Sequence, residues 1–418
     1  MKERKKKIIV LGSGFAALSI VKRIDPRFFE VSVVSPRNHF LFTPLLPSTT
    51  VGTIEFRSII EPVRTAKNVR ADDKSSGNFY QANCTSVSPS ENTIECESVQ
   101  NREKFKLDYD YLVIAVGAVN NTFGIPGVTE HALFLKELSD ARVIRGRIIQ
   151  NFEEASSPTV SLEERKRLLR FIVVGGGPTG VEFAAELNDL VREDLIKWYP
   201  RLVQDVEITL LEGTKQILSA FDSRLGEYAM KIFRRQSIDL RFNSPVKEVT
   251  KDSIILQDGT SISCGMVVWS TGIGPTDLIQ SLPFRKGRGS RLLTDDYLRV
   301  GEARNIFTAG DCATPASQSI PATAQAAQQE GKYLAAQLNN IAKGKPPSPF
   351  EYRHLGMLAY IGSRRALADL PNVKGRGFGA FLFWRSAYLT RLVSLKNKVL
   401  VLFDWLKASV FGRDISSF

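Results

Sequence analysis

Short, uninterrupted apolar runs alternate along the chain with stretches in which apolar residues recur every three or four positions. Ile8–Leu11 and Val31–Val34 are two such runs, and helical periodicity lies between them from Ala16 to Ile24. Continuous apolar runs are typical of parallel strands that are covered on both faces. This stretch therefore predicts a strand, a helix and a second, parallel strand.

The same order of elements recurs later in the chain. Phe171–Val174 predicts a strand, the segment from Val181 to about Trp198 a helix, and Val206–Leu211 the next strand. The glycine-rich turns that follow the two first strands begin at Gly12 and Gly175, a separation as long as a complete domain. That separation indicates duplication of a whole domain rather than a short structural repeat.

Outside these two stretches the pattern differs. Asn83–Asp108 alternates polar and apolar residues, which predicts small antiparallel strands, and Tyr111–Val116 predicts another buried strand. Ser253–Leu256 followed by Asp258-Gly259 predicts a hairpin. From Lys374 onward, aromatic and aliphatic residues interleave with basic ones, so we treat this region as a separate C-terminal element.

Composition narrows the class of protein. A chain of 418 residues fits two or three domains, and 43% hydrophobic with 24% charged residues excludes a disordered or fibrous protein. The four cysteines have no CxxC spacing and the three histidines are far apart, so neither a disulfide framework nor a metal site is expected. The net charge of +12 calls for an anionic partner, which could be a membrane surface, a nucleic acid or a phosphate-rich ligand.

The first glycine turn has the spacing of a dinucleotide-binding fingerprint. Residues Gly12 to Ala17 read GSGFAA, which fits G-x-G-x-x-G/A between a strand and a helix. In such a turn the second glycine allows a pyrophosphate to approach the backbone, and the helix amides bind the phosphates. The second strand ends at Ser35-Pro36-Arg37, without the carboxylate that usually binds a ribose. Alone, the motif could equally be a structural turn.

The second glycine turn matches the full fingerprint. Residues Gly175 to Gly180 read GGGPTG, and Glu212 ends the next strand, where a carboxylate would bind ribose hydroxyls. Its distance from Gly180 exceeds the usual spacing, which predicts a longer helix or a longer following loop. A carboxylate there favours NAD over NADP, although nearby Lys215 weakens that preference. Because two fingerprints in one chain are an improbable coincidence, the sequence predicts an α/β fold with two Rossmann-like dinucleotide-binding domains.

Three shorter motifs follow other predicted strands. Ala115-Val116-Gly117 and Ser270-Thr271-Gly272 end strands with small residues, as a close approach to a ligand or another chain segment requires. Gly310-Asp311-Cys312-Ala313 follows the predicted strand Asn305–Thr308, and we expect it to open a helical stretch. Asp311 could therefore bind sugar hydroxyls or act as a helix N-cap.

Together these motifs resemble the flavoproteins with two dinucleotide-binding domains, in which the first domain holds FAD and an inserted second domain holds NAD(P)H. Three stretches further resemble the type II NADH:quinone oxidoreductases (alternative NADH dehydrogenases), and the tail is similar to the fungal and plant members. These stretches are Val34–Pro47 (VSPRNHFLFTPLLP), Thr323–Glu330 (TAQAAQQE) and the tail motifs Trp384–Leu389 with Phe411–Asp414. The resemblance covers about residues 8–416 and includes no EF-hand loop.

The resemblance implies a domain assignment and two sets of binding residues. Residues 1–140 and 295–345 would form the FAD-binding domain, residues 141–294 the NADH-binding domain, and residues 346–418 a C-terminal amphipathic helical membrane-anchoring segment. The implied FAD contacts are Gly12, Ser13, Gly14, Phe15, Ala16, Ala17, Ser35, Pro36, Arg37, Thr43, Ala115, Gly117, Asp311, Ala324 and Gln325. The implied NADH contacts are Gly175, Gly177, Pro178, Thr179, Gly180, Glu182, Glu212, Thr271 and Gly272.

The resemblance also implies catalytic roles for Glu182, Gln325 and Gln329. Glu182 matches the family's glutamate near the nicotinamide, and the two glutamines, four positions apart, would share the helix face that borders the flavin and the quinone. From the residues alone, Glu182 could instead be an acid favoured by the helix dipole, and the glutamines ordinary surface residues. The implied reaction passes a hydride from NADH to FAD and then two electrons to quinone, without proton pumping.

Two other functions are compatible with the same fold. One is an NADH-dependent flavoprotein reductase whose acceptor is a redox protein, and the other is a non-enzymatic, NADH-sensing flavoprotein. The first domain lacks a CxxxxC pair, which argues against a disulfide reductase.

The tail has the composition of an interfacial segment. Residues 374–418 contain eight basic and two acidic residues, a net +6 that is half of the chain's +12, and no uncharged run is long enough for a transmembrane helix. Such a segment is typical of helices lying on an anionic leaflet, which predicts a peripheral protein of the mitochondrial inner membrane, or of the bacterial cytoplasmic membrane as the alternative. The same surface could pack on the body or form a homodimer. A nucleic-acid partner is not expected, because no basic and aromatic binding module accompanies the charge.

Overall fold

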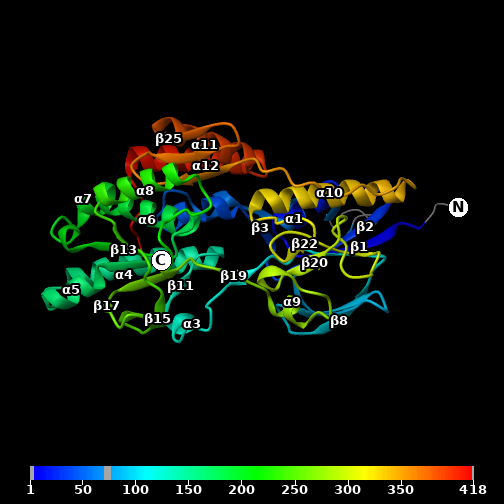
Figure 1. Ribbon diagram of the computed structural model, residues 1–418, viewed down its shortest axis with the longest axis horizontal. Coiled ribbons are helices and arrows are strands. Elements are labelled where there is room, and N and C mark those ends of the chain that lie inside the picture. Colours follow the sequence, from blue (N-terminus) through cyan, green and yellow to red (C-terminus); the bar gives the residue numbers. More distant parts are fainter. Residues whose placement is uncertain (1–3, 70–76, 417–418) are drawn as a thin grey trace. The chain divides into compact units, whose positions relative to one another are not determined.

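The computed structural model describes residues 4–69 and 77–416, and the chain forms two compact units (Figure 1). Unit 1 contains Met1–Leu41, Ile60–Val119 and Ile273–His354. Unit 2 contains Phe42–Ile59, Asn120–Gly272 and Leu355–Phe418. Each unit is built from segments that are far apart in the sequence, so neither is a continuous stretch of chain.

Unit 1 is organised around a five-stranded parallel sheet with the order β21-β9-β1-β2-β5. Alternate residues of the central strand point to opposite faces, so that Ile8 and Val10 enter one core cluster and Ile9 and Leu11 enter another. The strands are β1 (Lys6–Leu11), β2 (Phe29–Val34), β5 (Phe79–Tyr80), β9 (Tyr111–Ile114) and β21 (Ile306–Thr308).

Different layers cover the two faces of this sheet. One face packs against α1 (Phe15–Val21) and α10 (Ala324–Ala342), which approach each other so closely that a Cβ atom on Gly331 would lie 2.4 Å from the carbonyl oxygen of Ala16. The other face packs against an antiparallel meander of β6 (Ala82–Ser88), β7 (Thr93–Ser98) and β8 (Lys104–Asp108). Smaller elements of unit 1 are β3 (His39–Leu41), β4 (Ile60–Pro62), α9 (Asp277–Ser281), β20 (Leu292–Thr294) and β22 (Ala313–Pro315).

Unit 2 repeats the arrangement with a parallel sheet of order β11-β18-β12-β13-β14. The strands are β11 (Leu133–Phe134), β12 (Arg170–Val174), β13 (Glu207–Leu211), β14 (Asp239–Arg241) and β18 (Met266–Trp269), with an antiparallel group of β15 (Val246–Val249), β16 (Ser253–Leu256) and β17 (Ser261–Ser263). The helices are α2 (Leu46–Thr49), α3 (Val128–His131), α4 (Leu138–Ser156), α5 (Leu162–Leu168), α6 (Pro178–Leu190), α7 (Ile196–Trp198) and α8 (Ser223–Arg235). Short strands β10 (Val119–Asn120) and β19 (Ile273–Gly274) lie where the chain passes from one unit to the other.

The C-terminal segment belongs to unit 2. It forms an antiparallel sheet of β23 (Met357–Tyr360), β24 (Ala366–Asp369) and β25 (Lys374–Gly377), followed by α11 (Phe378–Arg391) and α12 (Leu395–Phe411). Its aromatic side chains pack inward, with the rings of Trp384 and Trp405 6.3 Å apart. Within the described residues, no helix is both long and apolar enough to cross a membrane.

The α/β class and the duplicated Rossmann-type sheets are confirmed, and two local predictions need correction. Asp311 does not open a helix: Ala313–Pro315 continues as strand β22, which pairs with β20, so the helix N-cap interpretation is wrong. The helix expected over residues 181–198 is interrupted by a π-helical turn, Val191–Leu195. The chain passes between the compact units near residues 119 and 273, and β11 pairs in the sheet of unit 2 while β20 pairs in unit 1.

Two glycines inside helices provide a test of the close α1–α10 contact. We expect Gly331→Ala to lower the free energy of unfolding by about 1–3 kcal/mol, because the added methyl overlaps the Ala16 carbonyl. Gly146→Ala in α4 is the matched control: no atom lies within 4 Å of its added Cβ, so it should stabilise the protein by about 0.5–1 kcal/mol. Denaturant titration of both variants measures this difference, and equal effects would contradict the packing.

Candidate functional site

The first glycine turn of unit 1, residues 12–17, forms what we call the first cradle. It is packed against the neighbouring backbone on one side and is open on the other. Gly12 has φ +108°, and a Cβ there would lie 2.3 Å from the carbonyl oxygen of Ala115. Gly14 is the N-cap of α1, and no atom lies within 4 Å of the position that a Cβ would take there. Because a helix N-terminus presents N–H groups to an anion, the turn fits a pyrophosphate.

Polar side chains meet beside this turn, at the end of β2. The Ser35 hydroxyl donates to Ser13 Oγ at 3.1 Å, and Arg37 Nε lies 3.3 Å from the same oxygen and 3.0 Å from the carbonyl oxygen of His39. The sequence lacks a ribose-binding carboxylate at this position. The structure shows two hydroxyls and a guanidinium there, which suit the sugar and phosphate groups of a nucleotide.

A buried glutamate fixes the turn that carries Asp311. Gly310 has φ +82° and its N–H donates to Glu330 Oε2 at 2.5 Å. Glu330 is buried in α10, and burial raises the pKa of its carboxyl to about 8. Sequence reasoning included Glu330 in the Thr323–Glu330 stretch but assigned it no role.

The two glutamines of α10 lie one helical turn apart. Both polar ends of the Gln329 amide bind the backbone of Arg353: Nε2 donates to its carbonyl oxygen at 2.8 Å, and Oε1 accepts from its N–H at 3.0 Å. Gln329 therefore holds the chain that follows α10. Gln325 and Ala324 lie at the start of α10 in unit 1, whereas Thr43, the remaining implied FAD contact, belongs to unit 2.

The second glycine turn, in unit 2, forms a similar cradle. Gly175 has φ +109° and its Cβ would lie 2.8 Å from that of Thr271, and a Cβ on Gly180 would lie 2.0 Å from the Gly175 carbonyl oxygen. Gly177 is the N-cap of α6, with Pro178 in the first turn and no atom within 4 Å of an added Cβ. These contacts explain why glycine is required at 175 and 180, whereas the position beside Gly177 is open.

Glu212 lies next to this turn, at the end of β13. Its carboxylate accepts from the N–H of Gly176 through Oε2 and from the N–H of Thr214 through Oε1, each at 2.7 Å. The two bonds hold the carboxylate at the edge of the glycine turn, the position from which an acidic residue binds ribose hydroxyls in this fold.

Glu182 is buried on α6, one turn after the second cradle. Oε1 accepts from the N–H of Tyr360 at 3.0 Å and from Trp384 Nε1 at 3.2 Å, and both donors come from the C-terminal segment. Burial raises the pKa of the Glu182 carboxyl to about 8, although the two donors oppose the shift. Glu182 is therefore enclosed by the C-terminal segment.

Two further carboxylates on the same face of α6 were not foreseen. Glu186 accepts from the hydroxyls of Ser48 at 2.6 Å and Thr53 at 2.8 Å. Asp189 accepts from the Tyr360 hydroxyl at 2.6 Å, and burial raises its pKa to about 7. Together with Glu182 they form what we call the carboxylate row. Its spacing of four and then three positions was visible in the sequence, but its partners are distant in the chain.

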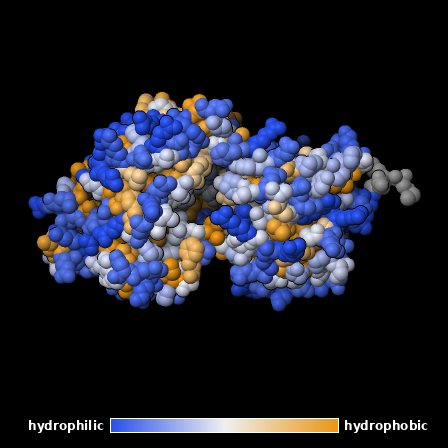
Figure 2. Space-filling model, in the orientation of Figure 1, coloured by the Kyte–Doolittle hydropathy of each residue, from blue (hydrophilic) through white to orange (hydrophobic). Residues whose placement is uncertain are grey.

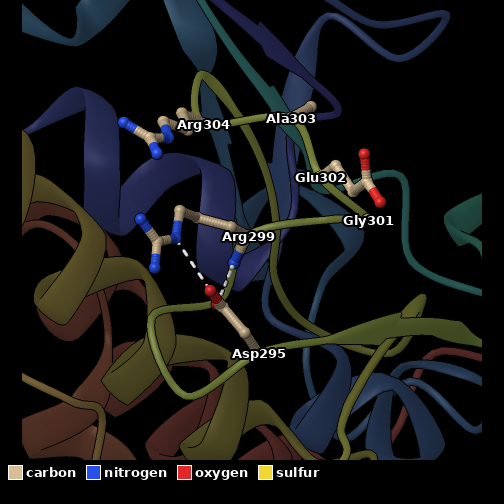
Figure 3. Close-up of a pocket in the computed structure, with 6 residues that line it drawn as sticks. All are labelled: Asp295, Arg299, Gly301, Glu302, Ala303 and Arg304. Carbon is tan, nitrogen blue, oxygen red and sulfur yellow. Dashed lines mark hydrogen bonds and ion pairs between the residues drawn. The ribbon is translucent and has the colours of Figure 1, made fainter.

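None of the predicted site residues lines a surface hollow of unit 1, whose lining residues are shown in Figure 3. Inside it, Arg299 Nε donates to the Asp295 carboxylate at 2.8 Å, so these two charged side chains bind each other. The described residues contain no cluster of His, Cys, Asp and Glu side chains able to hold a metal ion. The hollow is lined by Asp295, Arg299, Gly301, Glu302, Ala303 and Arg304.

Two glycine cradles, each at the carboxyl end of a parallel sheet, define a protein with two dinucleotide-binding domains. Family comparison agrees: residues 6–331 match the pyridine nucleotide-disulphide oxidoreductase family, and residues 354–414 match the NDH2 C-terminal domain. The chain belongs to this family and, within it, to the type II NADH:quinone oxidoreductases.

Individual relatives cover almost the whole chain. A probable NADH dehydrogenase of Dictyostelium discoideum is 49% identical over 99% of this chain and 91% of its own length. The mitochondrial internal alternative NAD(P)H-ubiquinone oxidoreductase A1 of Solanum tuberosum is 43% identical over 99% of this chain and 88% of its own. The structure of NDH2 from Plasmodium falciparum in complex with NADH matches with a TM-score of 0.93 and 29% identity, covering 99% of this chain and all of that one.

The raised pKa of Glu182 makes stability depend on pH. Its ordinary pKa is 4.5 and its folded value about 8, so between these values only the folded state holds the proton. Stability from this group is complete below pH 4.5 and is lost as pH rises toward 8, by about 1.4 kcal/mol per pH unit.

We expect Glu182→Gln to flatten the fall in stability between pH 5 and 8, since the amide does not titrate. The free energy of unfolding from denaturant titration at several pH values measures the slope. Glu163→Gln, at an exposed position of α5, is the control and should leave the slope unchanged. Parallel curves for the wild type and Glu182→Gln would contradict the assignment.

Proposed function

We propose that this protein oxidises NADH and reduces a ubiquinone-type quinone, with FAD as its redox cofactor and without pumping protons. The observation that carries this function is one chain with two glycine cradles followed by an NDH2 C-terminal domain. The residues of both cradles fit dinucleotides, since each turn needs glycine against the backbone and is open on its other side.

The first cradle would hold FAD. The Gly12–Ala17 turn with the α1 amides would bind the pyrophosphate, and Ser35 with Arg37 would bind the adenosine end. Asp311, on the turn fixed by Glu330, would bind the ribityl chain. When bound, FAD would supply the redox chemistry, accepting hydride from NADH and passing two electrons to quinone.

The second cradle would bind NADH. Gly175, Gly177 and Gly180 would receive the pyrophosphate at the N-terminus of α6, and Glu212 would accept hydrogen bonds from the ribose. Glu182 would keep a proton on its carboxyl at neutral pH, because its surroundings disfavour the charged form.

The start of α10 would border the flavin and the quinone. Gln325 would contact the quinone headgroup from the first turn of this helix. Gln329 would position the chain beside it, because its amide binds the backbone of Arg353 at both ends.

The C-terminal segment would place the protein on a membrane. Its helices are buried on one side by aromatic residues, but their other side exposes large apolar side chains, and apolar residues reach the surface over these helices in Figure 2. An exposed apolar strip beside basic residues favours an anionic lipid surface. The exposed residues are Phe378, Leu382, Phe383, Leu395, Val399, Leu402, Phe403, Leu406, Val410 and Phe411.

The relatives' mitochondrial names support association with mitochondria, and we propose the inner membrane as the surface. Quinones dissolve in lipid, so a protein that reduces them gains from binding the bilayer. A homodimer through the same exposed strip is the alternative to lipid. Concentration-dependent association in the absence of vesicles would favour the dimer.

The proposed reaction is tested by its two half-reactions under anaerobic conditions. The protein with bound FAD is mixed first with NADH and then with a short-chain ubiquinone, while flavin absorbance is followed by stopped flow. We expect rapid bleaching by NADH, slower bleaching by NADPH, and rapid recovery with quinone. Recovery only with a ferredoxin-type protein would support the protein-acceptor alternative, and a long-lived reduced state would support the sensing alternative.

Glu212 tests the NADH cradle. We expect Glu212→Ala to raise KM for NADH by about 10–100-fold and to reduce discrimination against NADPH, because a charge-assisted hydrogen bond to the ribose is lost. Since the same carboxylate also accepts from Gly176 and Thr214, Glu212→Gln is the control that keeps one acceptor oxygen and should lose less. KM for quinone should not change. An unaltered NADH-to-NADPH preference would remove Glu212 from the site.

Charge substitutions test the membrane surface better than truncation does, because truncation would also expose Glu182. We expect Phe403→Glu with Leu406→Glu to weaken binding to vesicles that contain anionic lipid by about tenfold or more. Val143→Glu with Leu162→Glu is the matched control: these side chains are 52% and 57% exposed, against 60% and 62%, and the charge change is equal. Equal losses in cosedimentation for both pairs would contradict the surface.

A further inference from the structure

Two of the four cysteines face each other across a pair of strands in unit 1. Cys84 in β6 and Cys96 in β7 are direct partners in the antiparallel register. Among the described residues, this is the one strand pairing that places two cysteines opposite each other. Direct antiparallel partners have Cα atoms about 4.5–5.5 Å apart, within the range of about 4.4–6.8 Å that a disulfide spans.

The local geometry allows the two sulfur atoms to meet. Both side chains point to the inner face of the hairpin, where Cys96 is fully buried and Cys84 is partly exposed. Immediately after Cys84 the register shifts by one residue, so that Thr85 is the extra residue of a bulge. Bulges bend a strand locally and therefore allow the small approach that a covalent bond requires.

The surroundings distinguish this pair from the other two cysteines. The Cys84 thiol lowers the pKa of Cys96, while the Cys96 thiol raises the pKa of Cys84, as expected of two thiols in direct contact. Cys264 and Cys312 are buried without such a neighbour, and burial raises their pKa to about 12 and about 11. A thiolate is thus favoured within the pair and disfavoured at the two other cysteines.

We propose that Cys84 and Cys96 are an oxidation site at which a hydroperoxide converts the two thiols into an intrachain disulfide. One thiolate attacks a peroxide oxygen, forming a sulfenic acid and releasing the second oxygen as water once a proton is taken up. The other thiol attacks the sulfenic sulfur, and a second water leaves as the S–S bond forms. Two thiols and one hydrogen peroxide thus give one disulfide and two waters.

The bond would tie together a hairpin that supports the first cradle. Two residues before Cys84, the N–H of Ala82 donates to the carbonyl oxygen of Ser35 at 3.2 Å, and the Gln81 amide donates to the carbonyl oxygen of Pro36 at 3.0 Å. The oxidation site therefore lies beside the Ser35–Arg37 segment of unit 1, but its chemistry does not require that FAD be bound there.

The test uses the full chain with its bound cofactor, reduced and then treated with hydrogen peroxide. After thiol blocking and digestion, we expect a peptide pair joined through Cys84 and Cys96, and titratable thiols in denaturant should fall from four to two. Dithiothreitol should restore all four. The products should be monomeric on a non-reducing gel.

Serine variants identify the partners. Cys84→Ser and Cys96→Ser should each abolish the linked peptides, whereas Cys264→Ser should form them as the wild type does. Four titratable thiols remaining in the treated wild type, or sulfinic acid at either cysteine without linked peptides, would overturn the proposal. Because peptide mapping of the wild type decides the matter alone, a poorly folded variant would not obscure the result.

Discussion

Unit 2 depends on one interaction: segments that are distant in the sequence enclose the carboxylate row of α6 and donate hydrogen bonds to it. A buried carboxylate without partners costs several kcal/mol, so each member of the row needs donors that the helix itself does not supply. Tyr360 and Trp384 supply donors to Glu182, and Ser48 with Thr53 supply them to Glu186. Helix α6, which begins at the second glycine cradle, is therefore held in place by the C-terminal segment and by residues 46–53.

The C-terminal segment consequently has two different faces. Its inner face donates hydrogen bonds and packs aromatic rings against α6. The Arg413 side chain, which is 8% exposed, pairs with Asp194 at 2.7 Å and Glu193 at 2.9 Å. Its outer face exposes apolar side chains. The proposed membrane surface would therefore lie on the segment that also encloses Glu182 of α6, the helix that begins at the second cradle.

The sequence predicted those features that short spacings determine. Local sequence patterns predict the glycine positions, the strands around them and the place of Glu212 at the end of a strand. The structure has the expected turns at 12–17 and 175–180. Glu186 and Asp189 were missed because their partners are remote in the chain: 138 positions separate Ser48 from Glu186, and 171 separate Tyr360 from Asp189. The helix expected after Asp311 was wrong because strand β22 forms through pairing with β20, a tertiary contact that outweighs the local helix signal. The roles of individual site residues remain predictions.

The most direct test of this account is NADH binding by a chain that ends at Val373 and so lacks β25, α11 and α12. Titration of NADH fluorescence measures the affinity for NADH. Thermal unfolding of the same samples measures the stability that the C-terminal segment provides. We expect NADH binding to be lost and unfolding to occur at lower temperature, because Glu182 loses the Trp384 donor and the aromatic cover of α6 is removed. A truncated chain that binds NADH and unfolds as the full chain does would contradict the claim that the C-terminal segment holds the NADH cradle in place.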